Sequence, residues 1–150
     1  MIALQHQIEI DRPVADVFQF ITRIENAPKW QPAVIESKRL TEGPLRVGTQ
    51  FREVATMMGR RVTTVCEITE LVGDRKIGWK ASSSGPFSYQ TTYTLTPAGP
   101  KTRLDIIGTF SLKGLWRLME PLARNEVRKE SAQELVAMKT AIESLPAGAR

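Results

Sequence analysis

The chain has 150 residues, of which 41% are hydrophobic and 25% are charged, and its formal net charge is +5. This length suits one domain with a sizeable core, and the composition excludes a disordered chain. No apolar run approaches the roughly 20 residues of a membrane span, and the N-terminal residues lack the basic start and apolar core of a signal peptide. We therefore expect a single cytoplasmic domain, residues 1–150, without stable membrane insertion.

The excess of positive charge does not predict a nucleic-acid partner. Basic residues are scattered, in pairs such as Lys38-Arg39 and Arg60-Arg61, and no nucleic-acid-binding motif accompanies them. The one cysteine, Cys66, cannot form an intrachain disulfide, which agrees with a reducing compartment. We expect a mildly basic, solvated surface and no nucleic acid, and the sequence leaves a homodimer open.

The first thirty residues predict one strand and two short helices. Apolar and polar residues alternate over residues 2–10, which is typical of a half-buried strand. Helical spacing follows from Val14 to Ile21, and a second helical piece near Ile24–Ala27 is expected to end at Pro28.

Six further strands are predicted from alternation and from the turn residues between them. They are expected near Val34–Leu40, Thr49–Met58, Arg60–Leu71, Lys76–Ser82, Phe87–Thr96 and Arg103–Leu112. The short connections favour antiparallel pairing of neighbours. Alternation gives this sheet one concave apolar face, except that the two sides of Thr49–Met58 are similar and its register stays open.

The helical pattern Gly114–Leu145 ends the chain and is nearly the only element that can cover that face. Its two apolar stripes, one from Leu115 to Leu122 and one from Val127 to Leu145, lie about 150° apart around a straight helix. Because proline removes a helical hydrogen bond, we expect a kink or break between Pro121 and Glu126. The first stripe would then lie near the hairpin tip at residues 57–59, with a cavity entrance beside the break.

This order of elements resembles the START-like (SRPBCC) superfamily and, within it, the polyketide cyclase/dehydrase and lipid-transfer family. The most specific local motifs are residues 8–18, with Ile10-Asp11-Arg12-Pro13 at the first strand-to-helix junction, and Trp30-Gln31-Pro32. The resemblance implies an α+β helix-grip fold, in which a bent seven-stranded antiparallel sheet wraps around a long C-terminal helix. It also implies hydrophobic ligands, such as lipids, polyketides or aromatic compounds. Such families include carriers and enzymes, so the resemblance leaves the chemistry open.

The residues argue against several kinds of site. One histidine and one cysteine are too few for a zinc site, no glycine-rich loop opens a helix to hold a phosphate, and no serine lies in a nucleophile elbow. We expect neither a metal nor a cofactor.

Ligand contacts are expected from the concave face, the hairpin tip and the terminal helix. The predicted contacts are Met57, Met58, Trp79, Phe87, Tyr89, Phe110, Met119 and Leu122. The candidate catalytic residues are His6, Glu53, Tyr89 and Tyr93. His6 has a suitable pKa for acid–base work, but a hydrogen-bonded histidine near the sheet edge is the favoured alternative. Glu53 is the best acidic candidate if its strand turns it inward, where burial would raise its pKa.

Three functions follow from these patterns. The leading hypothesis is binding or transport of a hydrophobic small molecule, because no catalytic constellation is evident. A cyclase, dehydratase or aldolase needs only one acid–base pair in a dry pocket, and it is favoured if two of the candidate polar groups converge within hydrogen-bond reach. A protein-interaction module ranks last, because the outer face of the sheet is mostly polar.

Overall fold

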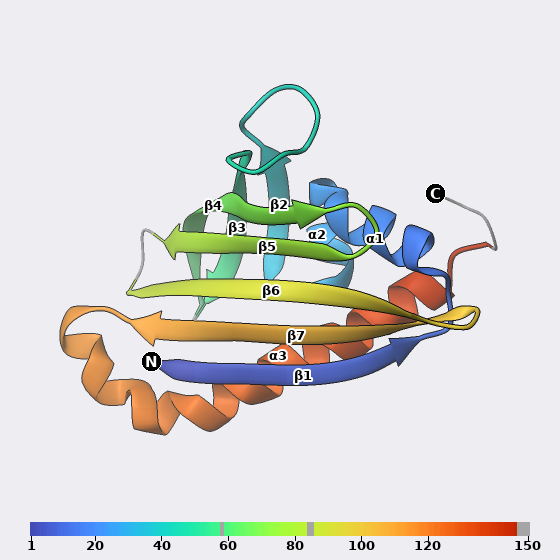
Figure 1. Cartoon of the computed structure of the whole chain (residues 1–150). Coiled ribbons are helices and arrows are strands. Elements are labelled where there is room, and N and C mark those ends of the chain that lie inside the picture. Colours follow the sequence, from blue (N-terminus) through green and yellow to red (C-terminus); the bar gives the residue numbers. More distant parts are fainter. Residues whose placement is uncertain (58, 84–85, 147–150) are drawn as a thin grey trace.

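The computed structural model describes residues 1–57, 59–83 and 86–146, so Met58, a predicted ligand contact, lies outside the described residues. The elements in chain order are β1 (Ile2–Ile10), α1 (Val14–Thr22), the 3-10 helix η1 (Ile24–Asn26), α2 (Ala27–Trp30), β2 (Val34–Arg39), β3 (Gln50–Met57), β4 (Arg60–Val72), β5 (Lys76–Ser83), β6 (Phe87–Ala98), β7 (Lys101–Leu112), the 3-10 helix η2 (Gly114–Met119) and α3 (Glu120–Glu143). Figure 1 shows this arrangement, which confirms the expected α+β helix-grip fold.

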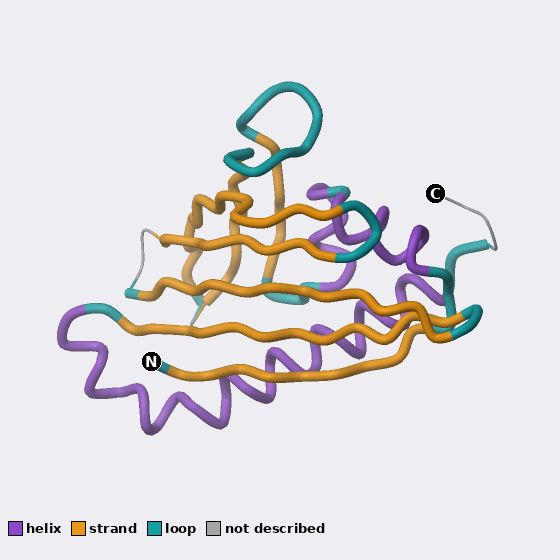
Figure 2. The backbone as a smooth tube through the Cα atoms, viewed as in Figure 1, coloured by secondary structure: helices purple, strands orange, loops and turns teal. Residues whose placement is uncertain are grey.

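The seven strands form one antiparallel sheet in the order β1-β7-β6-β5-β4-β3-β2. Strands β2 to β7 pair with their neighbours in the chain, and β1 adds to β7 with Leu4 opposite Gly108. The register of β3 is now fixed, because Phe51 and Glu53 are only 3% and 5% exposed and face the core. Figure 2 shows the curved sheet and the long helix that crosses it.

The core fills the end of the sheet at which α3 finishes. Leu135, Met138 and Ile142 of α3 are buried in one cluster with Ile68 and Leu104 of the sheet. The short helices close that end, where α1 buries Val17, Phe20 and Ile21. The second apolar stripe of the sequence is therefore the surface that packs, as its helical spacing predicted.

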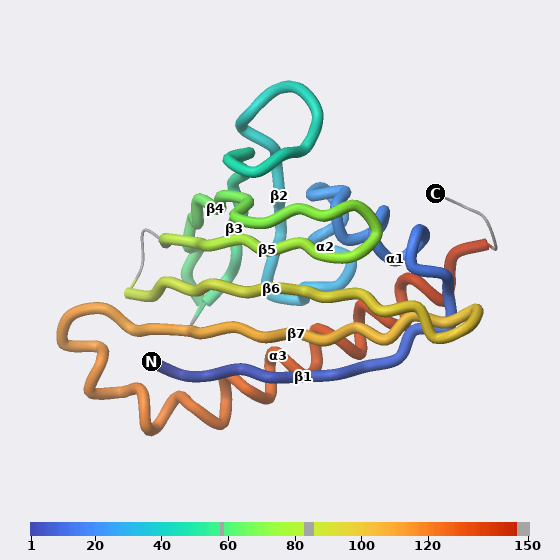
Figure 3. Tube along the Cα trace, in the orientation of Figure 1, coloured from blue at the N-terminus to red at the C-terminus, as the bar shows by residue number. Residues whose placement is uncertain are grey.

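The prediction of a break after Pro121 was wrong in position. Helix α3 is continuous from Glu120 to Glu143, and Pro121 lies in its first turn, where a missing N–H leaves no hydrogen bond unmade. The helical pattern divides earlier, into η2 up to Met119 and α3 from Glu120. Figure 3 shows the orange trace after β7 bending before α3 crosses the sheet. Pro28 likewise lies in the first turn of α2 instead of ending a helix.

The first apolar stripe does not pack on the sheet. Leu115, Leu118 and Leu122 are 86%, 78% and 76% exposed, and Met119 is 45% exposed. Among the described residues, η2 packs mainly against β7 and α3, and the expected packing on the hairpin tip at residues 57–59 includes Met58, which lies outside the described residues. The stripe is therefore a surface feature of the described structure.

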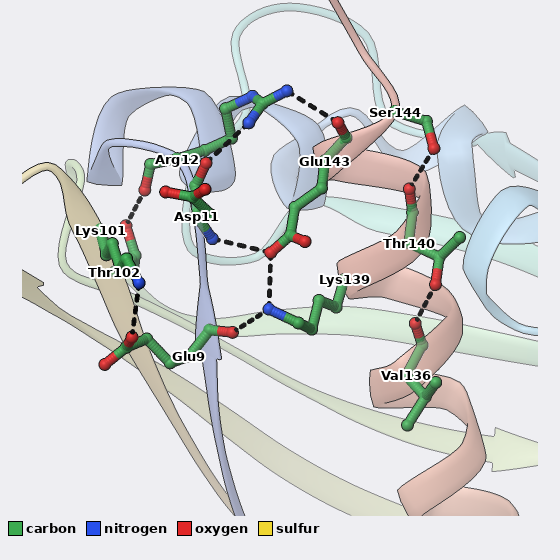
Figure 4. Close-up of polar contacts among 10 residues, drawn as sticks. All are labelled: Glu9, Asp11, Arg12, Lys101, Thr102, Val136, Lys139, Thr140, Glu143 and Ser144. Carbon is green, nitrogen blue, oxygen red and sulfur yellow. Dashed lines mark hydrogen bonds and ion pairs between the residues drawn. The ribbon is translucent and has the colours of Figure 1, made fainter.

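A polar clamp fastens the C-terminal end of α3 to the turn between β1 and α1 (Figure 4). The Arg12 guanidinium donates from Nη2 to the carbonyl oxygens of Glu143, at 2.7 Å, and Leu145, at 2.9 Å. The Glu143 carboxylate accepts from the Asp11 backbone N–H at 2.8 Å and from Lys139 Nζ at 2.6 Å. These contacts hold the pKa of Glu143 below its usual range. A cation at the carboxyl end of a helix also opposes the negative pole of the helix dipole.

We expect Arg12→Ala to lower the free energy of unfolding by about 1–2 kcal/mol, because two carbonyl oxygens at and just beyond the end of α3 lose a charged donor. Urea denaturation followed by circular dichroism measures this loss. Arg23→Ala, a change at an exposed arginine, is the matched control and should have little effect. A loss of the same size in both variants would contradict the role of the clamp.

Candidate functional site

A cavity of about 210 Å³ lies between the concave face of the sheet and the middle of α3, from Val127 to Glu134. Five of the predicted ligand contacts line it, namely Met57, Trp79, Phe87, Tyr89 and Phe110. The other walls include Leu4, Val34 and Ala55 of the sheet, and Val127 and Ser131 of α3. Met119 and Leu122 lie outside this lining, on the exposed stripe.

Aromatic rings form two sides of the cavity. Trp79 packs against Tyr93 with ring centroids 5.0 Å apart, and Phe51 and Trp30 lie edge-on behind this pair. On the other side, Phe87 stacks on Phe110 at 5.4 Å. Rings in fixed arrangements make a rigid apolar wall, which is typical of pockets for small molecules.

Glu53 is the central polar group of the cavity. Its side chain faces inward from β3, and its Oε1 accepts from the Tyr89 hydroxyl and from the Cys66 thiol, both at 3.5 Å. Burial raises the pKa of Glu53 from 4.5 to about 7, against the smaller lowering effect of these two donors. Burial also raises the pKa of Cys66 and of Tyr89, and the Glu53 charge adds to both effects. Glu53 is therefore a carboxyl group that can both give and take a proton near neutral pH.

A second carboxyl group enters the cavity from the opposite wall. Glu134 of α3 lines the cavity, and burial together with the negative charges of Glu53 and Glu130 raises its pKa to about 8. Tyr93 of β6 also lines the cavity, and burial with the charges of Glu134 and Glu53 raises its pKa well above the usual value. We did not predict Glu134 or Glu130 as site residues from the sequence.

Three of the four candidate catalytic residues line the cavity, and one does not. Glu53, Tyr89 and Tyr93 do, and Glu53 and Tyr89 come within hydrogen-bond reach of one another. His6 lies on the edge strand β1, half-buried and outside the cavity lining. Its Nε2 is buried without a hydrogen-bond partner among the described residues. The structure thus places His6 on an edge strand, in agreement with the favoured alternative, but its Nε2 does not make the hydrogen bond expected there.

Gly108 contributes to the shape of the inner face. It lies between Ile106 and Phe110, which both line the cavity. A Cβ atom at this position would lie 2.7 Å from the Gln90 carbonyl oxygen, closer than real contacts allow. Glycine is therefore required by the close approach of β6 and β7.

A wider depression of about 500 Å³ lies over β3 to β7, and the residues that line it differ from those of the cavity under α3. Most of the residues that line it are polar, among them Glu67, Lys80, Ser88 and Ser111. The apolar cavity under α3 is thus the better candidate site for a hydrophobic ligand.

The described part of the chain shows no group of three or more His, Cys, Asp or Glu residues placed to hold a metal ion. None of the described helices has the length and hydropathy of a bilayer span.

Residues 1–143 match the model of a family described as polyketide cyclase/dehydrase and lipid transport. The chain belongs to this family. No curated protein matches the chain.

Solved structures support the fold of this polyketide cyclase/dehydrase and lipid transport family member. A Thermus thermophilus protein, TTHA0849, superposes with a TM-score of 0.79 at 19% identity, covering 95% of this chain and 97% of that one. The Zhui aromatase/cyclase of Streptomyces sp. R1128 gives 0.77 at 16% identity, with 94% and 93% covered. A START superfamily protein of Mycobacterium smegmatis gives 0.72 at 16% identity, with 94% of each chain covered. At these identities the likeness shows the fold alone.

Proposed function

We propose that this chain binds a compact, largely apolar small molecule, such as a one- or two-ring aromatic compound, in the cavity under α3. The cavity itself carries the proposal, with its volume of about 210 Å³ and its aromatic walls. An engineered apolar cavity of about 150 Å³ holds benzene, whereas pockets for drug-sized ligands start at about 300 Å³. The volume therefore favours a small ring system over a whole long-chain lipid.

The charges of the lining residues narrow the range of suitable ligands further. Glu53, Glu130 and Glu134 bring three carboxyl groups to the wall, and the described lining includes no lysine, arginine or histidine. An anionic ligand would face these carboxylates without a compensating cation, at a cost that rises as they ionise. Neutral ligands with hydroxyl or carbonyl groups fit better, because protonated Glu53 and Tyr89 can donate hydrogen bonds to them.

Titration with 2-naphthol tests the binding function. Trp79 lines the cavity, so occupancy should change its fluorescence, and calorimetry gives the dissociation constant. Ala55→Phe fills the cavity and should weaken binding by at least about tenfold. Thr56→Phe, at an exposed neighbour on the same strand, is the matched control and should bind like the wild type. Equal binding by Ala55→Phe and the wild type would refute the proposed site.

A second candidate function is acid–base catalysis of the cyclase or dehydratase kind. The convergence of Glu53 and Tyr89 inside the cavity favours it, because such chemistry needs one proton-transfer pair in a dry pocket. Burial brings the pKa of Glu53 to about 7, where both of its protonation states are populated at neutral pH. This function is tested by measuring whether the rate of proton abstraction from a compact probe depends on Glu53.

A further inference from the structure

An exposed apolar surface stands at the junction of η2 and α3, far from the core. It consists of Leu115, Trp116, Leu118, Met119 and Leu122, which we call the η2 patch. Leu115, Leu118 and Leu122 are each more than three-quarters exposed, and Trp116 is 52% exposed. Figure 3 shows this segment, in orange, standing clear of the sheet beyond the end of β7. Adjacent large apolar side chains left in water mark an interaction site on a folded protein.

The exposed charges between Lys113 and Asn125 are all positive. Lys113, Arg117 and Arg124 are exposed on the same segment. Glu120 is the only acidic residue from Lys113 to Asn125, and it is turned inward, 7% exposed. Its carboxylate accepts from the Leu112 backbone N–H at 3.0 Å and pairs with the Met1 amino group. The segment therefore offers leucines, a tryptophan and three exposed cations up to Asn125, and the first exposed carboxylate follows at Glu126.

We propose that the η2 patch docks on an anionic phospholipid surface. Tryptophan and leucine beside lysine and arginine are the residues of segments that lie in the membrane interface, where the apolar side chains enter the headgroup region and the cations meet lipid phosphates. The contact is peripheral, and the fold remains as described. This docking does not depend on the proposed cavity ligand.

A second copy of the chain fits the same patch less well. Two copies facing each other through identical patches would bring the cations of one, Lys113, Arg117 and Arg124, close to those of the other. The exposed carboxylate that follows in the chain, Glu126, is one negative charge against these three cations. An anionic bilayer instead supplies the opposite charge over the whole contact.

Vesicle sedimentation with the intact chain tests the proposal. Vesicles of phosphatidylglycerol mixed with phosphatidylcholine should bind the protein, and vesicles of phosphatidylcholine alone should bind it at least about tenfold less. The emission of Trp116 should shift to the blue on binding, because Trp30 and Trp79 are already buried at 3% and 4% exposure. Added salt should weaken the binding, since the charges are exposed.

Variants with matched controls separate the apolar and charged parts. The double variant Leu118→Ser/Leu122→Ser should lose at least about tenfold in vesicle affinity, and so should Arg117→Glu/Arg124→Glu. Ile107→Ser, at a 63% exposed residue of β7, and Arg23→Glu are the controls and should bind like the wild type. Thermal unfolding checks that each variant is folded. Because the substituted residues are exposed, we expect the fold to be kept.

Three outcomes would overturn the proposal. One is the absence of binding to anionic vesicles, and another is equal binding by the patch variants and the wild type. The third is a blue shift of Trp116 that grows with protein concentration in the absence of vesicles and disappears in Leu118→Ser/Leu122→Ser, which would assign the patch to self-association. None of these results bears on 2-naphthol binding in the cavity.

Discussion

Replacing Glu53 with glutamine should slow the ring opening of 5-nitrobenzisoxazole in the cavity by about 10²-fold. In this reaction a base takes the proton from C3, the C≡N bond forms, and the N–O bond breaks to release a phenolate. A positioned general base contributes about 10²–10⁴ to such a step, and Glu53 is a carboxyl group of the cavity lining that accepts a hydrogen bond from Tyr89.

The pH profile of kcat/KM identifies the base. Because burial raises the pKa of Glu53 to about 7, kcat/KM should rise through about pH 7 as the carboxyl loses its proton. Glu126→Gln, at an exposed position of α3, is the control and should keep the wild-type rate. If Glu53→Gln keeps the rate while folded, the catalytic function of Glu53 is refuted and binding stands as the function.

The same substitution should change how stability depends on pH. Burial raises the pKa of Glu53 from 4.5 to about 7, so between these values the folded state holds a proton that the unfolded state has released. This contribution to stability is complete below about pH 4.5 and is lost as the pH rises through 7. Glu53→Gln removes the group that ionises, so it should remove about 2 kcal/mol of the decline between pH 5 and pH 8.

Urea denaturation at the two pH values measures this difference, with Glu126→Gln as the control. Glu134, whose pKa burial and the charges of Glu53 and Glu130 raise to about 8, remains in the variant and preserves part of the decline. Parallel stability curves for Glu53→Gln and the wild type would show that Glu53 is not a buried ionisable group.

Strand residues of the site could be predicted from the sequence because a strand has a fixed period of two. Trp79, Phe87, Tyr89 and Phe110 alternate with polar neighbours, so their shared face followed directly. Glu53 could not be assigned in this way, because the two sides of β3 carry similar residues. Its inward direction is set by pairing with β4, opposite Thr64, which is a long-range feature.

Glu134 was missed for a different reason. Val127, Ser131, Glu134 and Met138 follow one another at helical spacing, so polar residues interrupt the inner face of α3 where it crosses the cavity. Such an interruption is the signal that could have identified the cavity wall. An inner face assigned from apolar residues alone includes the part of α3 that packs in the core. It omits the part that lines the cavity.

The two proline errors have one cause. Pro28 and Pro121 were expected to end or break helices, but each lies in a first turn, where its fixed φ suits the helix and its missing N–H is not needed. Whether a proline begins or ends a helix depends on which flanking segment packs. The segment before Pro121 is largely exposed, and the packed segment follows it.

Locating a bound ligand tests the central claim, that the cavity under α3 is the binding site, most directly. Crystals soaked with 6-bromo-2-naphthol would show the bromine by its anomalous scattering. We predict one principal bromine site inside the cavity, within contact distance of Trp79, Phe87 or Phe110, and its loss in Ala55→Phe. Bromine found only outside the cavity, or at the same place in Ala55→Phe, would contradict the account.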